Sequence, residues 1–427
     1  MSVLTPLVLF QSARHLASSL RRGLLVLPIC IAPLSVEAAD PPAMVFDGHN
    51  DLPWQYRKRF DNRLDELDVA QPAPEMDPPL HTDFPRLKAG GVGAQFWSVY
   101  VPIDSYGGSP GDAAKVLEQM DVVRRLVARY PDNMALAMTA EDVRAAIAEG
   151  KVASMMGIEG GHAIENSLGV LRGLYDAGAR YMTLTHSKGL EWADSATDEL
   201  RHDGLTDFGV SVVREMNWLG MLVDLSHVSE ATMHDALDVA EAPVIFSHSS
   251  AMAVTDHPRN VPDSVLERLP ENGGIVMVTF VPSYVSQARR DWYLAYSGEK
   301  GRLEAVMPYD EEAREEALAS WKEANPDPGA TLSQVADHID HIRDMAGVEY
   351  IGVGGDFDGI EDVVEGLEDV SKYPDLFAEL SRRGYSDADI SAIAGGNAIR
   401  VLEEAEAAAA KLKADRLAAD PAATAIN

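Results

Sequence analysis

Histidine and carboxylate side chains follow several short apolar runs of this sequence. The run at 43–47 leads into His49 and Asp51, which are two residues apart and therefore point to the same side of an extended chain. Five further runs end in the same manner, with Glu159 and His162, His186, Asp224 and His227, His248, and Asp356 and Asp358. One histidine after a strand is usually structural. A repeated set of such residues is less easily explained in this way, because apolar runs tend to exclude charge. The joint pattern therefore indicates one shared site.

The residue types restrict the chemistry of such a site. Cys30 is the single cysteine, which excludes an intramolecular disulfide and any cysteine-based metal site. Histidines and carboxylates without cysteine suit zinc or another borderline divalent ion. Five or six candidate ligands exceed what one catalytic zinc needs, so a pair of ions about 3.5–4 Å apart that share a carboxylate is the natural arrangement. Such a pair supplies hydroxide for hydrolysis of a carbonyl or phosphoryl group, and the residues alone leave both open.

The elements that must position these residues are apolar runs that alternate with helical periods. The runs are 43–47, 92–101, 152–158, 180–185, 220–225, 243–247, 274–281 and 350–355. The helical stretches between them are 112–129, 140–149, 166–177, 206–218, 229–240, 262–270 and 331–346. This alternation predicts a parallel sheet, and eight strands close a (β/α)8 TIM barrel, with the candidate residues at its catalytic C-terminal face. A doubly wound open sheet is the competing fold, but no glycine-rich nucleotide motif supports it.

Further segments depart from the simple alternation. Two insertions, 55–90 and 284–330, exceed ordinary loop lengths, and the second is expected to be helical at 310–324. Insertions of this length often cover an active site, although surface decoration is the alternative. Extra helices are expected at the C-terminus, at 375–383, 386–394 and 396–413. His338 and His341 lie on a helix of the outer ring and are expected on a solvated or capping face.

The chain divides into three parts in this interpretation. Three arginines precede the apolar run 23–34, and small residues follow at the expected cleavage point, so 1–38 is predicted to be a signal peptide. The apolar run is short and interrupted by prolines, and an uncleaved N-terminal anchor is the alternative. Residues 39–410 are predicted to form a single metallohydrolase domain, and 411–427 a polar tail.

Composition excludes several partners. Among 427 residues, 36 are Lys or Arg and 68 are Asp or Glu, so the net charge is −32. This acidity argues against nucleic acid and against anionic lipid as partners, since both need clustered cations. Hydrophobic residues make up 46% of the chain, which is typical of a globular protein with a sizeable core.

The motifs resemble the membrane dipeptidase family of zinc peptidases over about residues 44–403. The similar segments are FDGHNDLPWQ at 46–55 and those at 158–187, 204–229, 242–251, 259–263, 332–342 and 354–376. The resemblance implies that His49 and Asp51 bind a first zinc, that His227 and His248 bind a second, and that Glu159 bridges the two.

The resemblance also implies roles around the substrate. His186 would bind the carbonyl oxygen or the developing oxyanion. Asp356 would take a proton from the bridging water and pass it to the leaving amine. Arg259 would clamp the terminal carboxylate, and Tyr284 matches a further substrate contact.

The expected activity is hydrolysis of dipeptides, including L-Xaa-D-Xaa, by a hydroxide that bridges two zinc ions. A related dinuclear amidohydrolase acting on N-acyl amino acids or β-lactams is the alternative, and a non-enzymatic binding protein on a decayed barrel is the third hypothesis. The resemblance suggests a homodimer. The predicted mature chain has no cysteine, and its tail is not an anchor signal, so an exported, periplasmic protein without a stable membrane anchor is expected.

Overall fold

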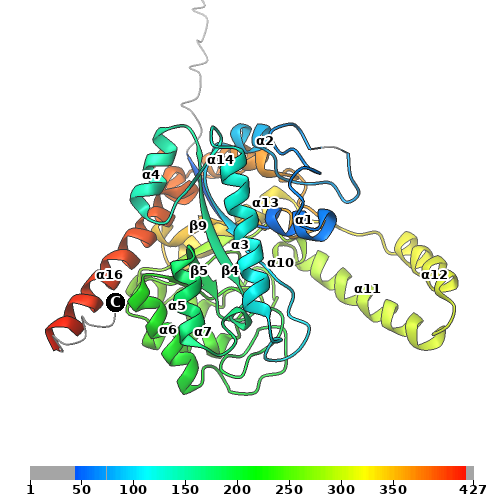
Figure 1. The fold of residues 1–427 in the computed structure, drawn as a ribbon. Helices are drawn as coiled ribbons and strands as arrows, with labels where there is room; N and C mark the ends of the chain where they lie inside the picture. The colour runs from blue at the N-terminus through cyan, green and yellow to red at the C-terminus, as the bar shows by residue number, and fades with distance from the viewer. Residues whose placement is uncertain (1–43, 74, 420–427) are drawn as a thin grey trace, which may run out of the picture. The chain divides into compact units, whose positions relative to one another are not determined.

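In the computed structural model, residues 44–73 and 75–419 are described, and eight parallel strands among them form a closed barrel (Figure 1). The strands are β1 (Val45–Asn50), β2 (Val92–Ser98), β4 (Val152–Glu159), β5 (Ala179–Thr183), β6 (Leu222–Asp224), β7 (Ile245–Phe246), β8 (Ile275–Val278) and β9 (Ile351–Val353). The ring closes where β2 pairs with β4, from Ala94 opposite Ala153 to Ser98 opposite Gly157. The predicted TIM barrel is confirmed, whereas the predicted signal segment lies outside the described residues.

A ninth strand, β3 (Met134–Leu136), was not predicted. It pairs with residues 152–154 of β4, the half of that strand that β5 leaves free, because β5 begins its pairing at Met156. Three residues are too few to produce a recognisable apolar run. Because β3 pairs only with the first residues of β4, it lies at the end of that strand away from Glu159 and leaves the barrel closed.

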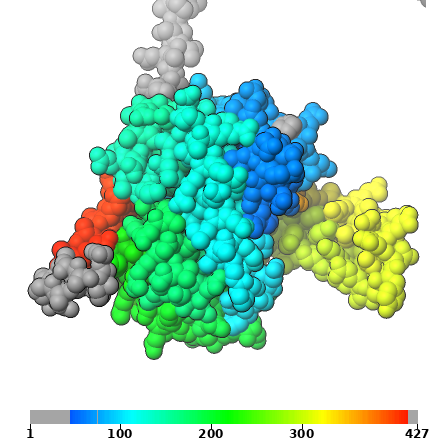
Figure 2. All heavy atoms as spheres, in the orientation of Figure 1, coloured from blue at the N-terminus to red at the C-terminus, as the bar shows by residue number. Residues whose placement is uncertain are grey.

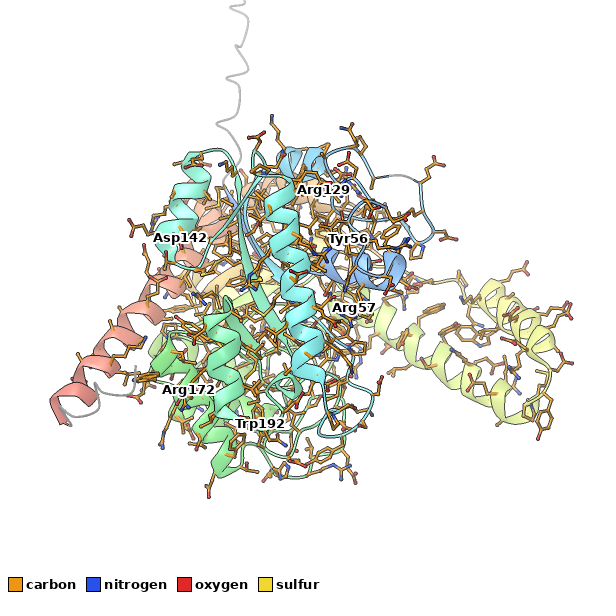
Figure 3. All side chains as sticks on the ribbon, in the orientation of Figure 1. Tyr56, Arg57, Arg129, Asp142, Arg172 and Trp192 are labelled. Carbon is orange, nitrogen blue, oxygen red and sulfur yellow. The ribbon has the colours of Figure 1, made fainter. Side chains whose placement is uncertain are left out.

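The helices that follow the strands are those expected from the periodicity, with boundaries shifted by a few residues. They are α3 (Asp112–Arg129), α4 (Ala140–Ala148), α5 (Leu168–Asp176), α6 (Asp207–Leu219), α7 (Glu230–Val239) and α13 (Leu332–Met345). Helix α5 is tied to α6 by the Arg172–Glu215 ion pair at 2.6 Å (Figure 3). The stretch predicted at 262–270 is two short helices, α8 (Asp263–Leu266) and α9 (Leu269–Asn272), with a proline in the first turn of α9.

The insertions contain more helix than expected. The first holds α1 (Leu52–Phe60) and α2 (Phe84–Ala89), and the second begins with α10 (Pro282–Val285). Helices α11 (Gln287–Val306) and α12 (Glu311–Ala324) then form a hairpin, here called the arm, that projects from the barrel (Figures 1 and 2). Only Arg289 and Leu303 of α11 are buried, and α12 has no buried residue. The arm therefore lacks the apolar stripe that would have revealed α11 in the sequence.

The C-terminal helices follow β9, and a π-helical turn among them reaches back to the start of β1. They are α14 (Tyr373–Arg382), α15 (Asp387–Ser391), a π-helical turn (Ala392–Gly396) and α16 (Asn397–Ala419). Gly395 approaches the start of β1 so closely that an added Cβ would lie 2.8 Å from the Met44 carbonyl oxygen. A side chain here would push α16 away from the strands. None of the described helices is long and apolar enough to cross a membrane.

His338 is fully buried, so the expectation that it lies on a solvated face was wrong. Its Nδ1 accepts a hydrogen bond from the Ala251 backbone N–H, and its Nε2 donates to the Val285 carbonyl, both at 3.0 Å. The ring therefore joins the loop after β7 to helix α10. His341, one turn along, is partly exposed and pairs with Asp263 at 2.7 Å.

Replacement of His338 is predicted to alter the pH dependence of stability. Burial lowers the pKa of His338 to about 4, from 6.5 in an unfolded chain. The unfolded state thus binds the proton more tightly, and up to about 3 kcal/mol of stability is lost as pH falls from 6.5 to 4. The variant His338→Asn should unfold about 1–3 kcal/mol more easily than the wild type at pH 7.5, and this gap should narrow towards pH 4.

The measurement is denaturant unfolding at several pH values. Val335→Ala, a buried change on the same helix, retains the histidine and serves as the control. Its gap to the wild type should stay constant with pH. A constant gap for His338→Asn as well would contradict the assigned burial effect.

Candidate metal centre and substrate site

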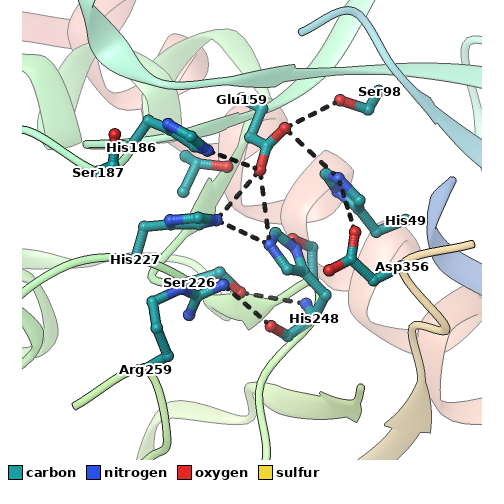
Figure 4. Close-up of polar contacts among 12 residues, drawn as sticks. His49, Ser98, Glu159, His186, Ser187, Ser226, His227, His248, Arg259 and Asp356 are labelled. Carbon is teal, nitrogen blue, oxygen red and sulfur yellow. Dashed lines mark hydrogen bonds and ion pairs between the residues drawn. The ribbon is translucent and has the colours of Figure 1, made fainter. Parts of the chain in front are cut away.

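The candidate residues meet at the C-terminal mouth of the barrel (Figure 4). His49 lies within β1 and Asp51 directly after it, and Glu159 is the last residue of β4. The others follow their strands within a few residues: His186 after β5, His227 after β6, His248 after β7 and Asp356 after β9. Six strands thus bring to one place side chains that the sequence separates by some three hundred positions.

Glu159 is the centre of the cluster. Its Oε2 lies 3.5 Å from His49 Nε2 and accepts a hydrogen bond from Ser98 Oγ at 3.2 Å. Its Oε1 faces the other histidines, at 3.0 Å from His227 Nε2, 3.5 Å from His186 Nε2 and 3.6 Å from His248 Nε2. The two oxygens of one carboxylate thus serve two different groups of donors.

The remaining carboxylates lie on the His49 side. His49 Nε2 is 3.2 Å from Asp51 Oδ2 and 4.0 Å from Asp356 Oδ1. Three sets of ligand atoms each fall within 4.8 Å of one another and could hold a metal ion. These sets are His49, Glu159 and His248; Glu159, His186 and His227; and His49, Asp51 and Asp356.

The donor atoms fit a divalent cation. His49 Nε2 and Asp51 Oδ1 are buried and have no hydrogen-bond partner among the described residues. His227 Nε2 and His248 Nε2 face each other at 2.9 Å, an arrangement that places two imidazole nitrogens around one point. Nitrogen and carboxylate oxygen without sulfur is the donor set that zinc and similar ions accept.

Burial and charge set the protonation of the cluster. Burial, reinforced by the positive charge of Arg259, holds the pKa of His227 well below its usual value, and burial with His49 and Arg259 does the same for His248. Both rings are therefore neutral, the form that binds metals. Burial alone would raise the pKa of Glu159, but the surrounding imidazoles hold it well below its usual range.

Asp356 differs from the other carboxylates. Burial raises its pKa well above the usual value, and although His49 opposes this, the negative charges of Asp51 and Glu159 act in the same direction. Its backbone is also unusual, with φ of 61° in the left-handed region, as is His227 with φ of 69°. Non-glycine residues rarely adopt this conformation, and such strain concentrates at functional sites.

A second layer of side chains orients the histidines. Asp224 Oδ2 accepts a hydrogen bond from Ser247 Oγ at 2.6 Å, and Ser247 Oγ lies 2.8 Å from His248 Nδ1. Because the hydroxyl proton is given to Asp224, Ser247 accepts from His248 Nδ1–H, which leaves the lone pair of Nε2 free towards the centre. On the opposite side, Tyr181 Oη lies 2.8 Å from His49 Nδ1.

Asp358 serves both the turn and the second layer. Its φ is 65°, a left-handed backbone conformation that Asp adopts in turns. Its carboxylate also accepts the His81 backbone N–H at 2.7 Å, and its own N–H donates to His81 Nδ1 at 3.0 Å. The first insertion is thereby fastened to the loop that carries Asp356.

Arg259 and Tyr284 stand beside the cluster. The Arg259 guanidinium is buried and donates to the His248 carbonyl and to Ser249 Oγ, both at 3.3 Å. It forms no ion pair with the described carboxylates, and it lies 5.4 Å from the centre of the Tyr284 ring. A buried cation without an anion is costly, so this arrangement suits an anionic ligand.

The structure brings together all nine residues named as metal-binding, catalytic or substrate-binding candidates, but it leaves out one histidine. His162 Nε2 bonds to the Val101 carbonyl at 3.1 Å and belongs to none of the metal-capable sets. Sequence reasoning missed Tyr100, whose ring lies 5.0 Å from both His186 and Trp54. It also missed Ser98, Tyr181 and Ser247, because neutral residues in strands or directly after them carry no distinguishing pattern.

A buried set of histidines and carboxylates at the mouth of a parallel β/α barrel defines a metal-dependent hydrolase. Residues 39–416 match the family model described as membrane dipeptidase (peptidase family M19). The chain belongs to this family of metallopeptidases, as the resemblance in the sequence predicted.

Curated relatives are similar over most of their length. The dipeptidase verJ of Clonostachys rogersoniana is 40% identical over 88% of this chain and 87% of that protein. The dipeptidase tcpJ of Claviceps purpurea is 42% identical over 86% of this chain and 78% of that protein.

Solved structures share the fold. The probable dipeptidase PvdM of Pseudomonas aeruginosa superposes with a TM-score of 0.73 at 24% identity, covering 86% of this chain and 96% of that one. A metallopeptidase of Rhodobacter sphaeroides bound to a phosphinate mimic of L-Ala-D-Ala gives a TM-score of 0.68 at 24% identity. The match covers 86% of this chain and 100% of that one.

The orientation of His248 by Ser247 leads to a prediction about metal affinity. Ser247→Ala removes the acceptor for His248 Nδ1–H, so the ring can rotate or change tautomer. Loss of such a partner weakens metal binding by about 10- to 100-fold. Competition with a chelator measures the affinity. Ser211→Ala, an exposed serine of α6, is the control and should leave the affinity unchanged. Unchanged affinity in Ser247→Ala would contradict the orienting role.

Proposed function

We propose that this chain is a dizinc dipeptidase that hydrolyses the amide bond of dipeptides, including L-Xaa-D-Xaa. The observation that carries the proposal is the division of the Glu159 carboxylate between two groups of donors, beside the buried Arg259, which pairs with no carboxylate in the described part of the chain. The L-Xaa-D-Xaa part is supported by the phosphinate ligand of the Rhodobacter sphaeroides protein.

The donor groups suggest how two zinc ions would be held. His49 and Asp51 would bind one ion, His227 and His248 the other, and Glu159 would be shared. When bound, the pair would supply positive charge that polarises the peptide carbonyl and lowers the pKa of a water.

The chain's own residues would then bind and orient the substrate. Arg259 would pair with the free α-carboxylate of the dipeptide, which fixes the distance between this end and the cluster. His186, whose Nε2 faces Glu159, would donate to the carbonyl oxygen as negative charge develops on it. The Tyr284 ring would pack against the same end of the substrate as Arg259.

Asp356 would move the proton. It lies on the His49 side, where its Oδ1 would accept the proton of the attacking water and return it to the nitrogen of the leaving amine. Its raised pKa suits this role, because a carboxyl that holds its proton more tightly is a better base and can still act as an acid.

Location and assembly belong to the same proposal. We infer export to the periplasm through a cleaved signal at 1–38, with N-terminal anchoring as the alternative, and a homodimer of chains. Mass measurement of the secreted protein would show whether residues 1–38 are removed.

The first test combines metal analysis with a substrate panel. Zinc-loaded protein should hold two ions per chain and hydrolyse L-Ala-L-Ala or L-Ala-D-Ala, whereas N-acetyl-alanine tests the alternative amidohydrolase activity. Glu159→Gln removes the shared negative charge, so metal content should fall below two and kcat should drop by about a thousandfold or more. Failure of the metal-loaded wild type to hydrolyse any dipeptide would contradict the proposal.

A second test concerns Arg259. Arg259→Met keeps much of the side-chain volume but removes the charge that would bind the α-carboxylate. The kcat/KM for L-Ala-D-Ala should fall by about 100-fold, whereas that for the C-terminally amidated dipeptide should change little. Arg302→Met, an exposed arginine of the arm, is the control. Equal losses for the free and the amidated substrate would contradict the carboxylate role.

A further inference from the structure

Arg290, in the first turn of α11, has a guanidinium without a partner. Its Nη1 is buried and makes no hydrogen bond, and no ion pair involves Arg290 within residues 44–73 and 75–419. Arg289, the preceding residue, does form ion pairs, with Asp327 at 2.9 Å and with Asp362 at 2.6 Å. Arg289 therefore fastens the base of the arm, whereas the donor capacity of Arg290 is unused.

The first turn of α11 packs on the loop that carries Arg259. The Asp256 N–H donates to Gln287 Oε1 at 2.8 Å, and Asn260 Nδ2 donates to the Tyr284 carbonyl at 2.8 Å. Arg290 is three residues after Gln287, so the two side chains share a face of the helix. That face looks onto the loop between β7 and α8, beside the substrate site.

His257 in this loop offers a second unused donor. Its Nδ1 accepts the Arg259 backbone N–H at 3.1 Å, so the neutral ring carries its proton on Nε2. No described residue accepts a hydrogen bond from that nitrogen. The ring centre lies 4.2 Å from that of Tyr284, which in turn contacts Arg259. Burial, followed by the charge of Arg290, lowers the pKa of His257 to about 3, consistent with a neutral ring near that guanidinium.

Arg290 and Arg259 have no carboxylate partner among the described residues, although the protein is strongly acidic. Helix α11 has Arg289 and Arg290 but no acidic residue in its first turn, where the helix dipole already disfavours cations. Arg259 adds a further positive charge across Tyr284. The adjacent Asp291 accepts instead from Gln287 Nε2 at 2.7 Å, and no carboxylate among the described residues pairs with Arg290.

We propose that Arg290 and His257 form a second anion subsite, which binds the side-chain carboxylate of an aspartyl or glutamyl residue at the C-terminal position of the dipeptide. The inference rests on the proposed function, because Arg259 is taken to hold the α-carboxylate of the same residue. His257 packs on Tyr284 with ring centres 4.2 Å apart, and Tyr284 lies 5.4 Å from Arg259, so the subsite is on the Arg259 side of the cluster. This places both carboxylates of one acidic residue on that side.

The test compares charged and neutral side chains of the same shape. For the zinc-loaded wild type, kcat/KM for L-Ala-D-Asp should exceed that for L-Ala-D-Asn by about tenfold or more, since a charge-assisted hydrogen bond is lost in the amide. In Arg290→Gln the value for L-Ala-D-Asp should fall by about 10- to 100-fold, while those for L-Ala-D-Asn and L-Ala-D-Ala change less than about threefold. Arg290→Lys should restore part of the preference, and Arg302→Gln, on the same helix, should leave it intact.

Two results would overturn the inference: no preference for aspartate over asparagine in the wild type, or an equal loss on all three substrates in Arg290→Gln. If no dipeptide is hydrolysed, the proposed function fails, and calorimetry with free aspartate and asparagine decides the subsite separately. Tighter binding of aspartate in the wild type, lost in Arg290→Gln, would uphold it. Equal binding of both amino acids by the wild type would overturn it.

Discussion

Everything at the barrel mouth depends on one buried anion, the Glu159 carboxylate, held among four imidazoles. Burial disfavours an ionised carboxylate, and only the surrounding histidines keep its pKa low. The same negative charge, together with Asp51, helps to raise the pKa of Asp356, so the pKa values of two buried carboxyl groups move in opposite directions because of their surroundings. In the proposed mechanism one acidic group is thus a fixed charge and the other a proton carrier. The barrel contributes by holding their separations constant.

The second layer explains how those separations are maintained. Asp224 accepts from Thr183 Oγ1 and Ser247 Oγ and from the backbone N–H groups of Ser226 and Ser247, so three neighbouring strands converge on one carboxylate. The His248 ring is oriented through this network and not by packing alone. On the other side, His49 is hydrogen-bonded to Tyr181, whose ring packs against Phe96 in the barrel interior. The rings of these two candidate ligands are thereby coupled to the core.

The sequence predicted the barrel and the candidate site because both rest on strong local signals. The eight apolar runs are buried strands, and histidines such as His227 and His248 follow them at the mouth. The arm helix α11 gave no such signal, since it buries almost no apolar surface. His338 was misjudged because helical position alone does not reveal that two loops cover it. Arg290 looked like any solvated arginine, and only the folded chain shows that its partners are missing.

The closure of the barrel also determines when, during synthesis of the chain, the site is completed. Strands β1 and β9 are neighbours, so Asp51 and Asp356 come together only when the final strand has joined the first. The His81–Asp358 contacts join the first insertion to the loop after β9. A growing polypeptide that has not yet passed residue 358 therefore lacks Asp356, the proposed proton carrier, and the contacts that hold its loop. If Asp356 has this role, peptide-cleaving capacity is acquired only at the end of translation and folding, and incomplete chains do not possess it.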